Sequence, residues 1–446
     1  MKILLIQAYT VLDEPPIFPL GLAYLAAMLT EHEIKVFDMN IVEEPLPKIE
    51  TMIKDFSPDV IGYSMRNMKL VMPGVHFSCF KPHQDAIQWI KKVSPHIPII
   101  AGGSAFSLYA EEIMSKVPEI DMGVFGEGEI TFKELLNNIK NPENVKSVYY
   151  RTNGSLVFTG YRERPDFKDL PMPRRDIVDI SQYKHPTAIG VETTRGCAFR
   201  CIYCSDLYLL GGTVRTRNAK SVVDEIEYLI KNYGVKNIMF ADQVFNLPAK
   251  HAKEICEEII RRKIDIQWTA WFTPLGIDEE IVILAKKAGC VVFNFSPESV
   301  DDDVLKKMKK GISYKDIEKI NKIAKKFNVP VAYNFMLNLP GETLRSIIKL
   351  LWFVLKTKIK MGRLFRPHGN FVVPVRIYPH TELQEISIQE GVIEKTDDLI
   401  EARFYSPKSM VKYLGQFILD IFVWLWRVKN FNRSIFHKRV VKKFGG

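Results

Sequence analysis

Apolar positions in the first 140 residues fall into short runs separated by longer amphipathic stretches. Short apolar runs are typical of strands, and apolar positions three or four residues apart are typical of helices. The expected strands are Lys2–Ala8, Ile34–Asp38, Asp59–Ser64, Ile97–Gly102 and Met122–Phe125, and the expected helices are Pro19–Leu29, Asp85–Val93, Ala105–Met114 and Thr131–Ile139. Because short strands alternate with helices, this region predicts an α/β domain with a parallel, Rossmann-like sheet.

The alternation pauses at residues 141–185 and then resumes. That stretch holds a hairpin-like segment, Ser147–Thr159, and a proline-rich run, so we expect it to be a linker. From 186 to 365 the expected strands are Thr187–Thr193, Asn237–Ala241, Gln267–Trp271, Val291–Phe295 and Val331–Leu337, and the expected helices are Ala219–Tyr233, Ala249–Arg262, Glu279–Ala288, Asp302–Lys309, Tyr314–Phe327 and Thr343–Thr357. These units predict a partial or full β/α barrel. Residues 366–446 add a strand, Phe371–Tyr378, and a helical basic tail.

Composition narrows the class of protein. The chain has 446 residues, of which 47% are hydrophobic and 26% charged, and this composition excludes global disorder. The net charge is +10, but the residues from Arg403 onward carry ten basic side chains and one acid, Asp420. The body of the chain is therefore nearly neutral, which argues against nucleic acid as a partner. Neither a secretory leader nor a long apolar span is evident, and we expect a cytoplasmic location.

The sharpest chemical signal is the run Cys197-Ala-Phe-Arg-Cys201-Ile-Tyr-Cys204, directly after a predicted strand. Three thiolates in a tight loop suit three irons of a [4Fe–4S] cluster and leave the fourth iron open. A structural zinc site would usually need a fourth Cys or His at matching spacing, and His185 is twelve residues upstream. Three buried cysteines or a zinc knuckle remain the alternative. The other cysteines are expected to be packing residues: Cys79, Cys256 and Cys290.

The motif and its place after the first barrel strand resemble the radical S-adenosylmethionine (SAM) superfamily, over Thr187–Leu355. The resemblance implies that the open iron binds the amino and carboxylate groups of SAM, and that reduction of SAM yields a 5′-deoxyadenosyl radical. It also implies SAM contacts from six residues: Tyr203, Asp242, Glu298, Ser299, Asn334 and Gly341. Packing is the alternative role for Tyr203, and a helix cap or surface ion pair is the alternative for Asp242 and Glu298. The Ser-Pro that precedes Glu298 departs from the family's usual Gly-Ile-like residues.

The ends of the predicted strands in the first domain carry a second resemblance. Glycines at these ends allow a large ligand to approach the backbone closely. Segments such as Gly102-Gly103-Ser104 and Gly126-Glu127-Gly128 follow predicted strands in this way. Because they precede a radical SAM barrel, the domain that holds them resembles the cobalamin-binding domain of the cobalamin-dependent radical SAM class. The implied cobalamin contacts are Ser64, Arg66, Asn67, Gly102, Gly103, Ser104, Gly126, Glu127 and Gly128.

One departure concerns the cobalt ligand. The loop Tyr9–Pro16 lacks the D-x-H-x-x-G motif through which other cobalamin proteins ligate cobalt. If cobalamin binds, no histidine of such a motif holds the lower face of the cobalt. Arg66 and Asn67 would then face the cobalt and favour release of the methyl group. The alternative is that both residues cap the next segment. The Met- and Phe-rich loop Ser64–Pro82 either shields the cobalamin or fills the core.

The segment Ser409–Lys429 predicts an amphipathic helix with a narrow polar stripe and several aromatic residues. Its basic character suits peripheral contact with an anionic membrane surface. A helix that caps the barrel mouth is the alternative.

These features predict a cobalamin-dependent radical SAM enzyme that methylates an unactivated carbon. Its expected cofactors are a [4Fe–4S] cluster, SAM and cobalamin, and its expected partners are a small-molecule, lipid or peptide substrate and an electron donor such as ferredoxin or flavodoxin. One alternative is a radical SAM cyclase or carbon–carbon coupling enzyme that acts on a lipid or tetrapyrrole. A second is a non-catalytic corrinoid-binding protein. Peripheral membrane contact through the tail would accompany the cytoplasmic location.

Overall fold

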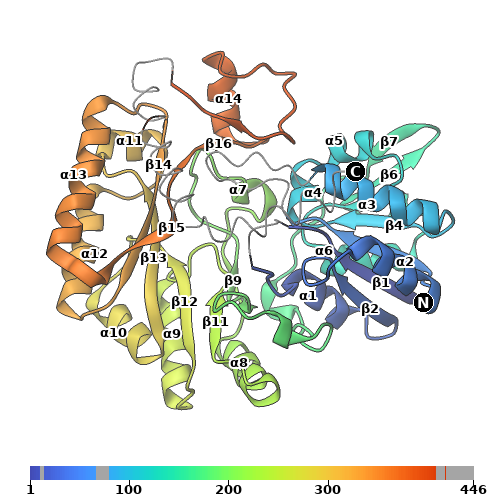
Figure 1. Ribbon diagram of the computed structural model, residues 1–446, viewed down its shortest axis with the longest axis horizontal. Coiled ribbons are helices and arrows are strands. Elements are labelled where there is room, and N and C mark those ends of the chain that lie inside the picture. Colours follow the sequence, from blue (N-terminus) through green and yellow to red (C-terminus); the bar gives the residue numbers. More distant parts are fainter. Residues whose placement is uncertain (11–14, 67–79, 408–416, 418–446) are drawn as a thin grey trace. The chain divides into compact units, whose positions relative to one another are not determined.

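The computed structural model describes residues 1–10, 15–66, 80–407 and 417. The described residues form two compact units, one ending at His185 and the other beginning at Pro186 (Figure 1). Asn67, Cys79 and the tail segment Ser409–Lys429, apart from Phe417, lie outside the described residues. Within the part of the chain that is described, no helix has the length and apolar character needed to cross a membrane.

The first unit is built on a seven-stranded sheet with the order β2-β1-β3-β4-β5-β6-β7. Its strands are β1 Lys2–Gln7, β2 Glu33–Asp38, β3 Val60–Ser64, β4 Ile99–Gly102, β5 Met122–Val124, β6 Val148–Thr152 and β7 Ser155–Phe158. Its α-helices are α1 Leu20–Met28, α2 Pro45–Phe56, α3 Phe80–Val93, α4 Ser104–Leu108, α5 Ala110–Lys116 and α6 Gly128–Asn137. Strands β1 to β5 are parallel, which confirms the predicted Rossmann-like sheet.

Two local features of this unit differ from the expectation. Helix α2 was not expected, because the prolines at its start suggest a break in regular structure. Proline is nevertheless compatible with the first turn of a helix, where the backbone N–H has no intrahelical partner. The helix expected at Ala105–Met114 is divided into α4 and α5 at Tyr109. Neither difference alters the sheet.

The stretch 141–185, expected to be a linker, belongs to the first unit. Strands β6 and β7 extend its sheet in antiparallel fashion, and Tyr149 stacks on Phe158 with ring centroids 4.4 Å apart. Further along, the Tyr183 hydroxyl donates a 2.7 Å hydrogen bond to the buried carboxylate of Asp38. The expected boundary at residue 140 therefore lies inside the unit, because the hairpin pairs with β5 instead of spanning a gap.

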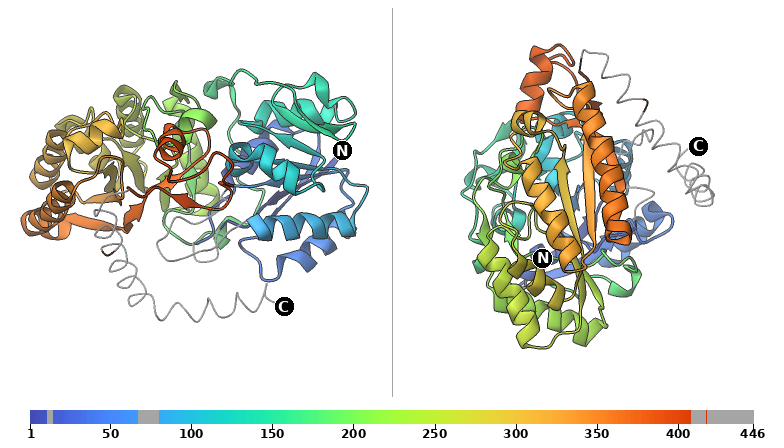
Figure 2. Two further views of the ribbon diagram at one scale, coloured as in Figure 1. Left: turned by 90° about the horizontal axis from the view of Figure 1, so that it is seen from above. Right: turned by 90° about the vertical axis from the view of Figure 1, so that its left-hand side faces the viewer.

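The second unit is an open, six-stranded parallel sheet with the order β15-β14-β13-β12-β11-β8 and helices on its outer face (Figures 1 and 2). Its strands, of which β9 pairs with β10 and β16 with β17 in two separate antiparallel sheets, are β8 Gly190–Val191, β9 Thr194–Arg195, β10 Arg215–Thr216, β11 Asn237–Phe240, β12 Gln267–Phe272, β13 Cys290–Glu298, β14 Val331–Leu337, β15 Phe365–Pro374, β16 Arg376–Ile377 and β17 Arg403–Phe404. Its α-helices are α7 Asp206–Leu209, α8 Ala219–Tyr233, α9 Ala249–Arg261, α10 Glu279–Lys287, α11 Asp302–Lys307, α12 Tyr314–Lys326, α13 Leu344–Met361 and α14 Glu382–Gln389. The architecture is the partial-barrel form of the prediction.

The barrel sheet ends differently from the expectation. The sixth strand is β15, which begins at Phe365 and pairs in parallel with β14. The strand expected at Phe371–Tyr378 is therefore the later part of β15 followed by the short β16. The barrel consequently extends beyond its expected end at residue 365.

Aromatic side chains link the strands in the core of this unit. Phe240 and Phe245 stack with centroids 4.7 Å apart, and Trp268 contacts both rings. Phe272 continues the contacts to Phe293 on the next strand. A barrel core filled in this way favours ligand binding at the carboxyl ends of the strands.

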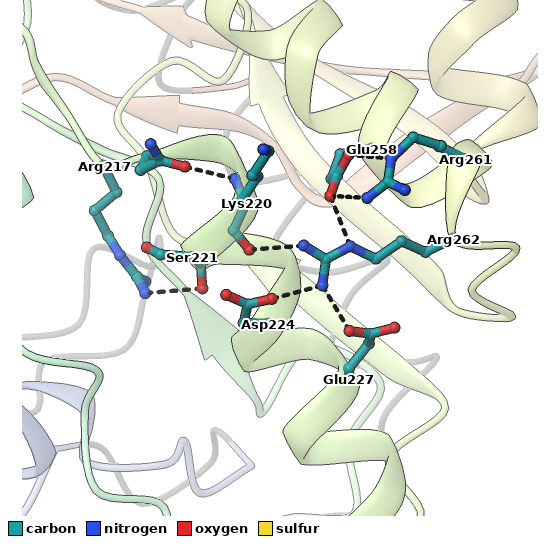
Figure 3. Close-up of polar contacts among 9 residues, drawn as sticks. Arg217, Lys220, Ser221, Asp224, Glu227, Glu258, Arg261 and Arg262 are labelled. Atoms are coloured by element: carbon teal, nitrogen blue, oxygen red, sulfur yellow. Dashed lines mark hydrogen bonds and ion pairs between the residues drawn. The ribbon is translucent and has the colours of Figure 1, made fainter.

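Charged contacts hold α8 against α9 and anchor the start of the barrel. The Arg262 guanidinium bonds to Asp224 on α8 at 2.5 Å and to Glu258 on α9 at 2.6 Å (Figure 3). A second, buried pair joins Arg217 to Glu225 at 2.5 Å. Arg217 also donates to the Glu192 carbonyl at 3.0 Å, between β8 and β9. The chain that enters the cysteine motif is thereby attached to α8.

Candidate active site

The cysteine motif occupies a loop that follows β9. Gly196 has a φ of +96°, and a Cβ there would lie 2.2 Å from the Thr213 carbonyl oxygen, so the loop requires glycine at this position. Cys197 N donates to Gly211 O at 3.2 Å, and Cys204 N donates to Cys201 O at 3.1 Å. These bonds tie the start of the motif to Gly211 and form a turn between Cys201 and Cys204.

All three motif cysteines are free thiols and partly exposed, whereas Cys256 and Cys290 are free but buried. The packing role expected for the latter two is confirmed by their burial. The partial exposure of the motif thiols is what a ligand set needs, and it argues against simple packing.

Burial raises the pKa of each thiol in the motif, and the positive charge of Lys310 opposes this effect at Cys197 and Cys201. A thiol with a raised pKa is protonated near neutral pH. Iron must therefore displace protons when it binds, so metal loading depends on pH.

Among the described residues, no three His, Cys, Asp or Glu side chains converge as the ligands of one metal ion would. The expectation of a cluster rests on the spacing of the three cysteines along the chain, which suits three irons of a [4Fe–4S] cluster.

A buried lysine adjoins the motif. Lys310 donates to the Tyr203 hydroxyl at 2.7 Å and to Glu298 Oε1 at 3.0 Å, and Tyr203 donates to the same oxygen at 2.9 Å. Burial alone would lower the pKa of Lys310, but the charge of Glu298 and its hydrogen bond to the ammonium group hold the pKa above its usual value. The lysine therefore stays protonated and places a positive charge beside the cysteine loop.

Glu298 owes its position to an unusual backbone conformation. Its φ is +67°, which non-glycine residues rarely adopt, and it ends β13. The register of β13 against β14 shifts between Phe295 and Glu298. The Ser-Pro departure from the family pattern, at residues 296 and 297, falls within this irregularity. The strand end is thus bent at the point where Glu298 meets Lys310.

Asp242, just after β11, is fully buried and accepts three hydrogen bonds. Thr193 donates from its N–H at 2.7 Å and from its hydroxyl at 2.6 Å, and Thr194 N–H donates at 3.0 Å. Burial nevertheless raises the pKa of Asp242 to about 7. Asp242 is thus neither a helix cap nor part of a surface ion pair. It joins the ends of β8 and β11 and holds a carboxyl group that a bound cation would ionise.

Several buried polar atoms near the ends of barrel strands have no hydrogen-bond partner within the described structure. They are Thr194 Oγ1, Gln243 Oε1, Asn334 Oδ1 and Asn338 Oδ1. Leaving such atoms unpaired is costly, and native proteins usually satisfy them with water or a ligand. The residues present therefore fit a polar ligand such as SAM.

The remaining two expected SAM residues make local contacts. Ser299 Oγ accepts from Asp301 N at 3.2 Å, just before α11. Gly341 has a φ of +77°, and a Cβ there would meet the Lys307 side chain at 2.2 Å. These contacts give both residues structural roles, and their contact with SAM stays a prediction.

Sequence reasoning missed Lys310, Glu342 and the segment after β16. Burial raises the pKa of Glu342 to about 7, and its carboxylate accepts from Asn338 N at 2.7 Å. Leu383 N, in α14, donates to the Ile202 carbonyl at 2.8 Å, inside the cysteine motif. The His380 ring stacks on Tyr208 with centroids 4.0 Å apart. No local pattern marks Lys310 or the segment after β16, because they reach the motif only through the fold, whereas the hydrogen bond of Glu342 is a local one with Asn338.

In the first unit, the expected cobalamin residues gather at the carboxyl ends of adjacent parallel strands. Ser64 ends β3, Gly102 ends β4, and Gly126 to Gly128 follow β5. The sheet order places β2 and β3 on opposite sides of β1, so the chain reverses direction across the sheet there. Ligands of open α/β sheets bind at the carboxyl edge near such a switch point.

The glycines at this edge have different roles. Gly103 has a φ of +97°, and a Cβ there would meet the Met65 carbonyl oxygen at 2.4 Å, so it lets the β3 and β4 loops approach. Around Gly126, with a φ of +76°, a Cβ would meet no atom within 4 Å. Space therefore lies beside Gly126, and helix α6 begins just after it without a side-chain cap. Open space beside uncapped backbone N–H groups fits a large polar ligand.

Ser104 and Arg66 are joined at this edge, since Ser104 Oγ donates to the Arg66 carbonyl at 3.0 Å. Arg66 is exposed. Asn67 lies outside the described residues, so the prediction that both residues face cobalt stays a prediction.

Comparisons with known proteins match both units. Residues 191–354 match the radical SAM superfamily, and residues 9–136 match the B12 binding domain. An uncharacterised methyltransferase of Pyrococcus horikoshii is 27% identical over 445 residues, covering 95% of this chain and 92% of that protein. An anaerobic magnesium-protoporphyrin IX monomethyl ester cyclase of Rubrivivax gelatinosus is 23% identical over 345 residues, 74% of this chain and 60% of that protein.

A solved structure shows the same fold. The radical SAM methyltransferase TsrM from Kitasatospora setae, with tryptophan and a SAM analogue bound, superposes with a TM-score of 0.80 at 20% identity. The match covers 95% of this chain and 89% of that one. The fold is therefore shared over nearly the whole chain.

Replacing Lys310 with Met should destabilise the cofactor-free protein by about 3 kcal/mol, because Glu298 is left buried without its counter-ion. The control is Lys309→Met, which removes an exposed pair with Glu382 and should cost less than about 1 kcal/mol. Glu298→Gln in the Lys310→Met background should restore part of the loss. Urea unfolding measures all three, and equal costs for the two lysine variants would contradict the buried-pair account.

The raised pKa values of Asp242 and Glu342 predict how stability changes with pH. Between about pH 4 and 7 these carboxyl groups are protonated in the folded chain but ionised in the unfolded one, so the free energy of unfolding should fall as pH rises. Asp242→Asn should reduce that fall by an amount on the order of 1 to 4 kcal/mol. The exposed Asp265→Asn should leave it unchanged. Denaturant unfolding of the cofactor-free protein across this range is the measurement, and a fall of wild-type size in Asp242→Asn would contradict the assignment.

Proposed function

Because this chain belongs to the cobalamin-binding class of the radical SAM superfamily, we propose that it is a methyltransferase that acts on an unactivated carbon. The observation that carries the proposal is the partly buried Lys310–Glu298–Tyr203 network beside three free, partly exposed cysteines. The network places charged groups of both signs next to the cysteine loop. It suits a site that must hold a zwitterionic ligand next to a metal cluster.

In this proposal Cys197, Cys201 and Cys204 hold the [4Fe–4S] cluster. When bound, the cluster, SAM and cobalamin together supply hydrogen abstraction by a radical and a transferable methyl group. The carboxyl group of Asp242 receives the SAM ammonium, and the positive charge of Lys310 lies near its carboxylate. Both interactions keep SAM in one orientation, which is the part of the chemistry that the protein controls.

The polar atoms near the strand ends complete the SAM site. The unpaired oxygens of Asn334 and Asn338 accept hydrogen bonds from the ligand, and Glu298 and Tyr203 bind on the side of the cysteine loop. Ser299 and Gly341 support this edge through their local contacts. Each of these groups is fixed by the backbone at a strand end, so the site is largely formed before SAM arrives.

We assign cobalamin to the carboxyl edge of the first unit. Gly126 leaves room for the ligand, and the N-terminus of α6, which has no side-chain cap, would receive its polar substituents. The segment after β1 holds no histidine. The proposal keeps the expectation that Arg66 and Asn67 would lie toward the metal without ligating it, and Asn67 lies outside the described residues. The domain boundary that suits this assignment is residue 185 and not residue 140.

A cyclase is the second candidate, and the similarity to the magnesium-protoporphyrin cyclase over 74% of this chain favours it. Both candidates would use the same cluster site. They differ in the fate of the methyl group, which reaches the product only in the methyltransferase.

The proposed partners follow from the chemistry. A cluster that must be reduced requires an electron donor, for which ferredoxin or flavodoxin is suited, and a small molecule is the substrate. We also propose that the protein is cytoplasmic and that the tail from residue 409 touches the membrane surface, since its segment is basic and rich in aromatic residues.

The test uses the full chain, reconstituted anaerobically with iron, sulfide and cobalamin, and SAM with a trideuterated methyl group. A small-molecule extract from cells that lack the gene supplies the substrate. The methyltransferase proposal predicts a product that carries the intact trideuterated methyl group. Cys201→Ala should abolish the product, because one iron loses its ligand, whereas Cys256→Ala, which changes a buried cysteine outside the motif, should retain it.

Mass spectrometry decides between the outcomes. Release of 5′-deoxyadenosine with a modified product that lacks the label would overturn the methyltransferase proposal in favour of the cyclase. A labelled product from Cys201→Ala would overturn the role of the cysteine motif.

A further inference from the structure

Helix α13 exposes an unusual apolar surface. Its inner face is buried against the barrel through Ile347, Leu350 and Phe353. On its other side six large apolar residues are between 47% and 72% exposed. They are Leu344, Ile348, Leu351, Trp352, Leu355 and Ile359. Single exposed apolar residues are ordinary, but six on one helix form a continuous patch that calls for a partner.

The patch has a regular geometry. At 3.6 residues per turn, its six residues lie within an arc of about 100° around the helix axis. Basic residues border this arc on both sides: one side has Arg345, Lys349, Lys356 and Lys360, and the other has Lys358. We call the six apolar residues and these five basic residues the α13 face. Helix α13 contains no Asp or Glu.

The neighbouring helix adds to the positive charge. Helix α12 carries five lysines against two acids, Asp316 and Glu318. Lys349 and Lys356 of the α13 face pair with Asp301 and Glu318, at 2.6 Å and 3.5 Å. The right-hand view of Figure 2 faces this side of the barrel, where α12 and α13 lie next to each other.

We propose that the α13 face docks on an anionic lipid bilayer surface. An apolar arc that contains a tryptophan, bordered by Lys and Arg, is the pattern of helices that lie in the membrane interface. The aliphatic stems of the border lysines extend along the apolar surface while their charges reach the headgroups. Attraction to anionic lipid adds to burial of the apolar arc. The helix lies on the membrane and does not cross it.

Two other partners for the α13 face are a second copy of this chain and the chain's own tail, and electrostatic repulsion disfavours both. A second copy of the chain would bring an identical basic border against the first, and like charges repel. The chain's own tail, residues 408–446, has nine basic residues and one acid, so it would also add positive charge to a positive surface. An anionic bilayer is the complementary partner for both segments.

The test is sedimentation of the full chain with vesicles of phosphatidylglycerol and phosphatidylcholine, and with vesicles of phosphatidylcholine alone. We expect binding to the anionic vesicles that weakens as salt rises. Leu355→Glu should weaken binding at least about ten-fold, because a charge replaces an apolar group that enters the interface. The matched control is Leu275→Glu, which changes a leucine of similar exposure elsewhere in the barrel unit and should bind as the wild type does.

Thermal unfolding checks that Leu355→Glu and Leu275→Glu both fold. A double variant, Lys358→Gln with Lys360→Gln, tests the contribution of the basic border to binding without altering the apolar arc. That double variant should lose the preference for anionic vesicles. Wild-type protein that stays in the supernatant with both kinds of vesicle would overturn the proposal. So would binding by Leu355→Glu equal to that of the wild type, or a dimer in sedimentation velocity that Leu355→Glu dissociates. Binding that appears only after removal of residues 408–446 would show that the tail covers the α13 face, and would overturn it too.

Discussion

The interaction on which the candidate site depends is the buried ion pair between Lys310 and Glu298. It lies where the irregular end of β13 meets the cysteine loop, and Tyr203 of the motif bonds to both partners. A buried pair costs desolvation energy, so it adds little stability by itself. Its value is positional, because each charge has a single favourable place. The strand end, the residues after α11 and the cysteine loop are thereby held in one arrangement.

The same physical rule places both cofactor sites. In parallel sheets the strands end together, and the loops and helix N-termini that follow them leave backbone groups unpaired. The first unit presents glycines and the uncapped helix α6 at that edge, which suits a bulky ligand approached through the backbone. The second unit presents charged and amide side chains at its edge, which suits a small zwitterion. One architecture would thus serve the two proposed ligand sites through different side chains.

The sequence alone predicted those features that arise from residues close together in the chain. The spacing of Cys197, Cys201 and Cys204 and the alternation of strands and helices could be seen in the sequence, because neighbours in the chain create them. Lys310 and Leu383 could not, since only tertiary folding brings them to the site. The hairpin β6–β7 was mistaken for part of a linker because its pairing with β5 leaves no sequence signal. The outward face of α13 was likewise hidden, because apolar residues there and in the core look alike.

The central claim is that the loop of Cys197, Cys201 and Cys204 holds a cluster whose open iron meets SAM beside Lys310 and Glu298. Electron–nuclear double resonance tests it most directly, on the anaerobically reduced full chain with SAM labelled with nitrogen-15 at its amino group. The account predicts a hyperfine coupling between the label and the cluster, which Lys309→Met should leave unchanged. A reduced cluster that shows no nitrogen-15 coupling in the presence of saturating SAM would contradict it.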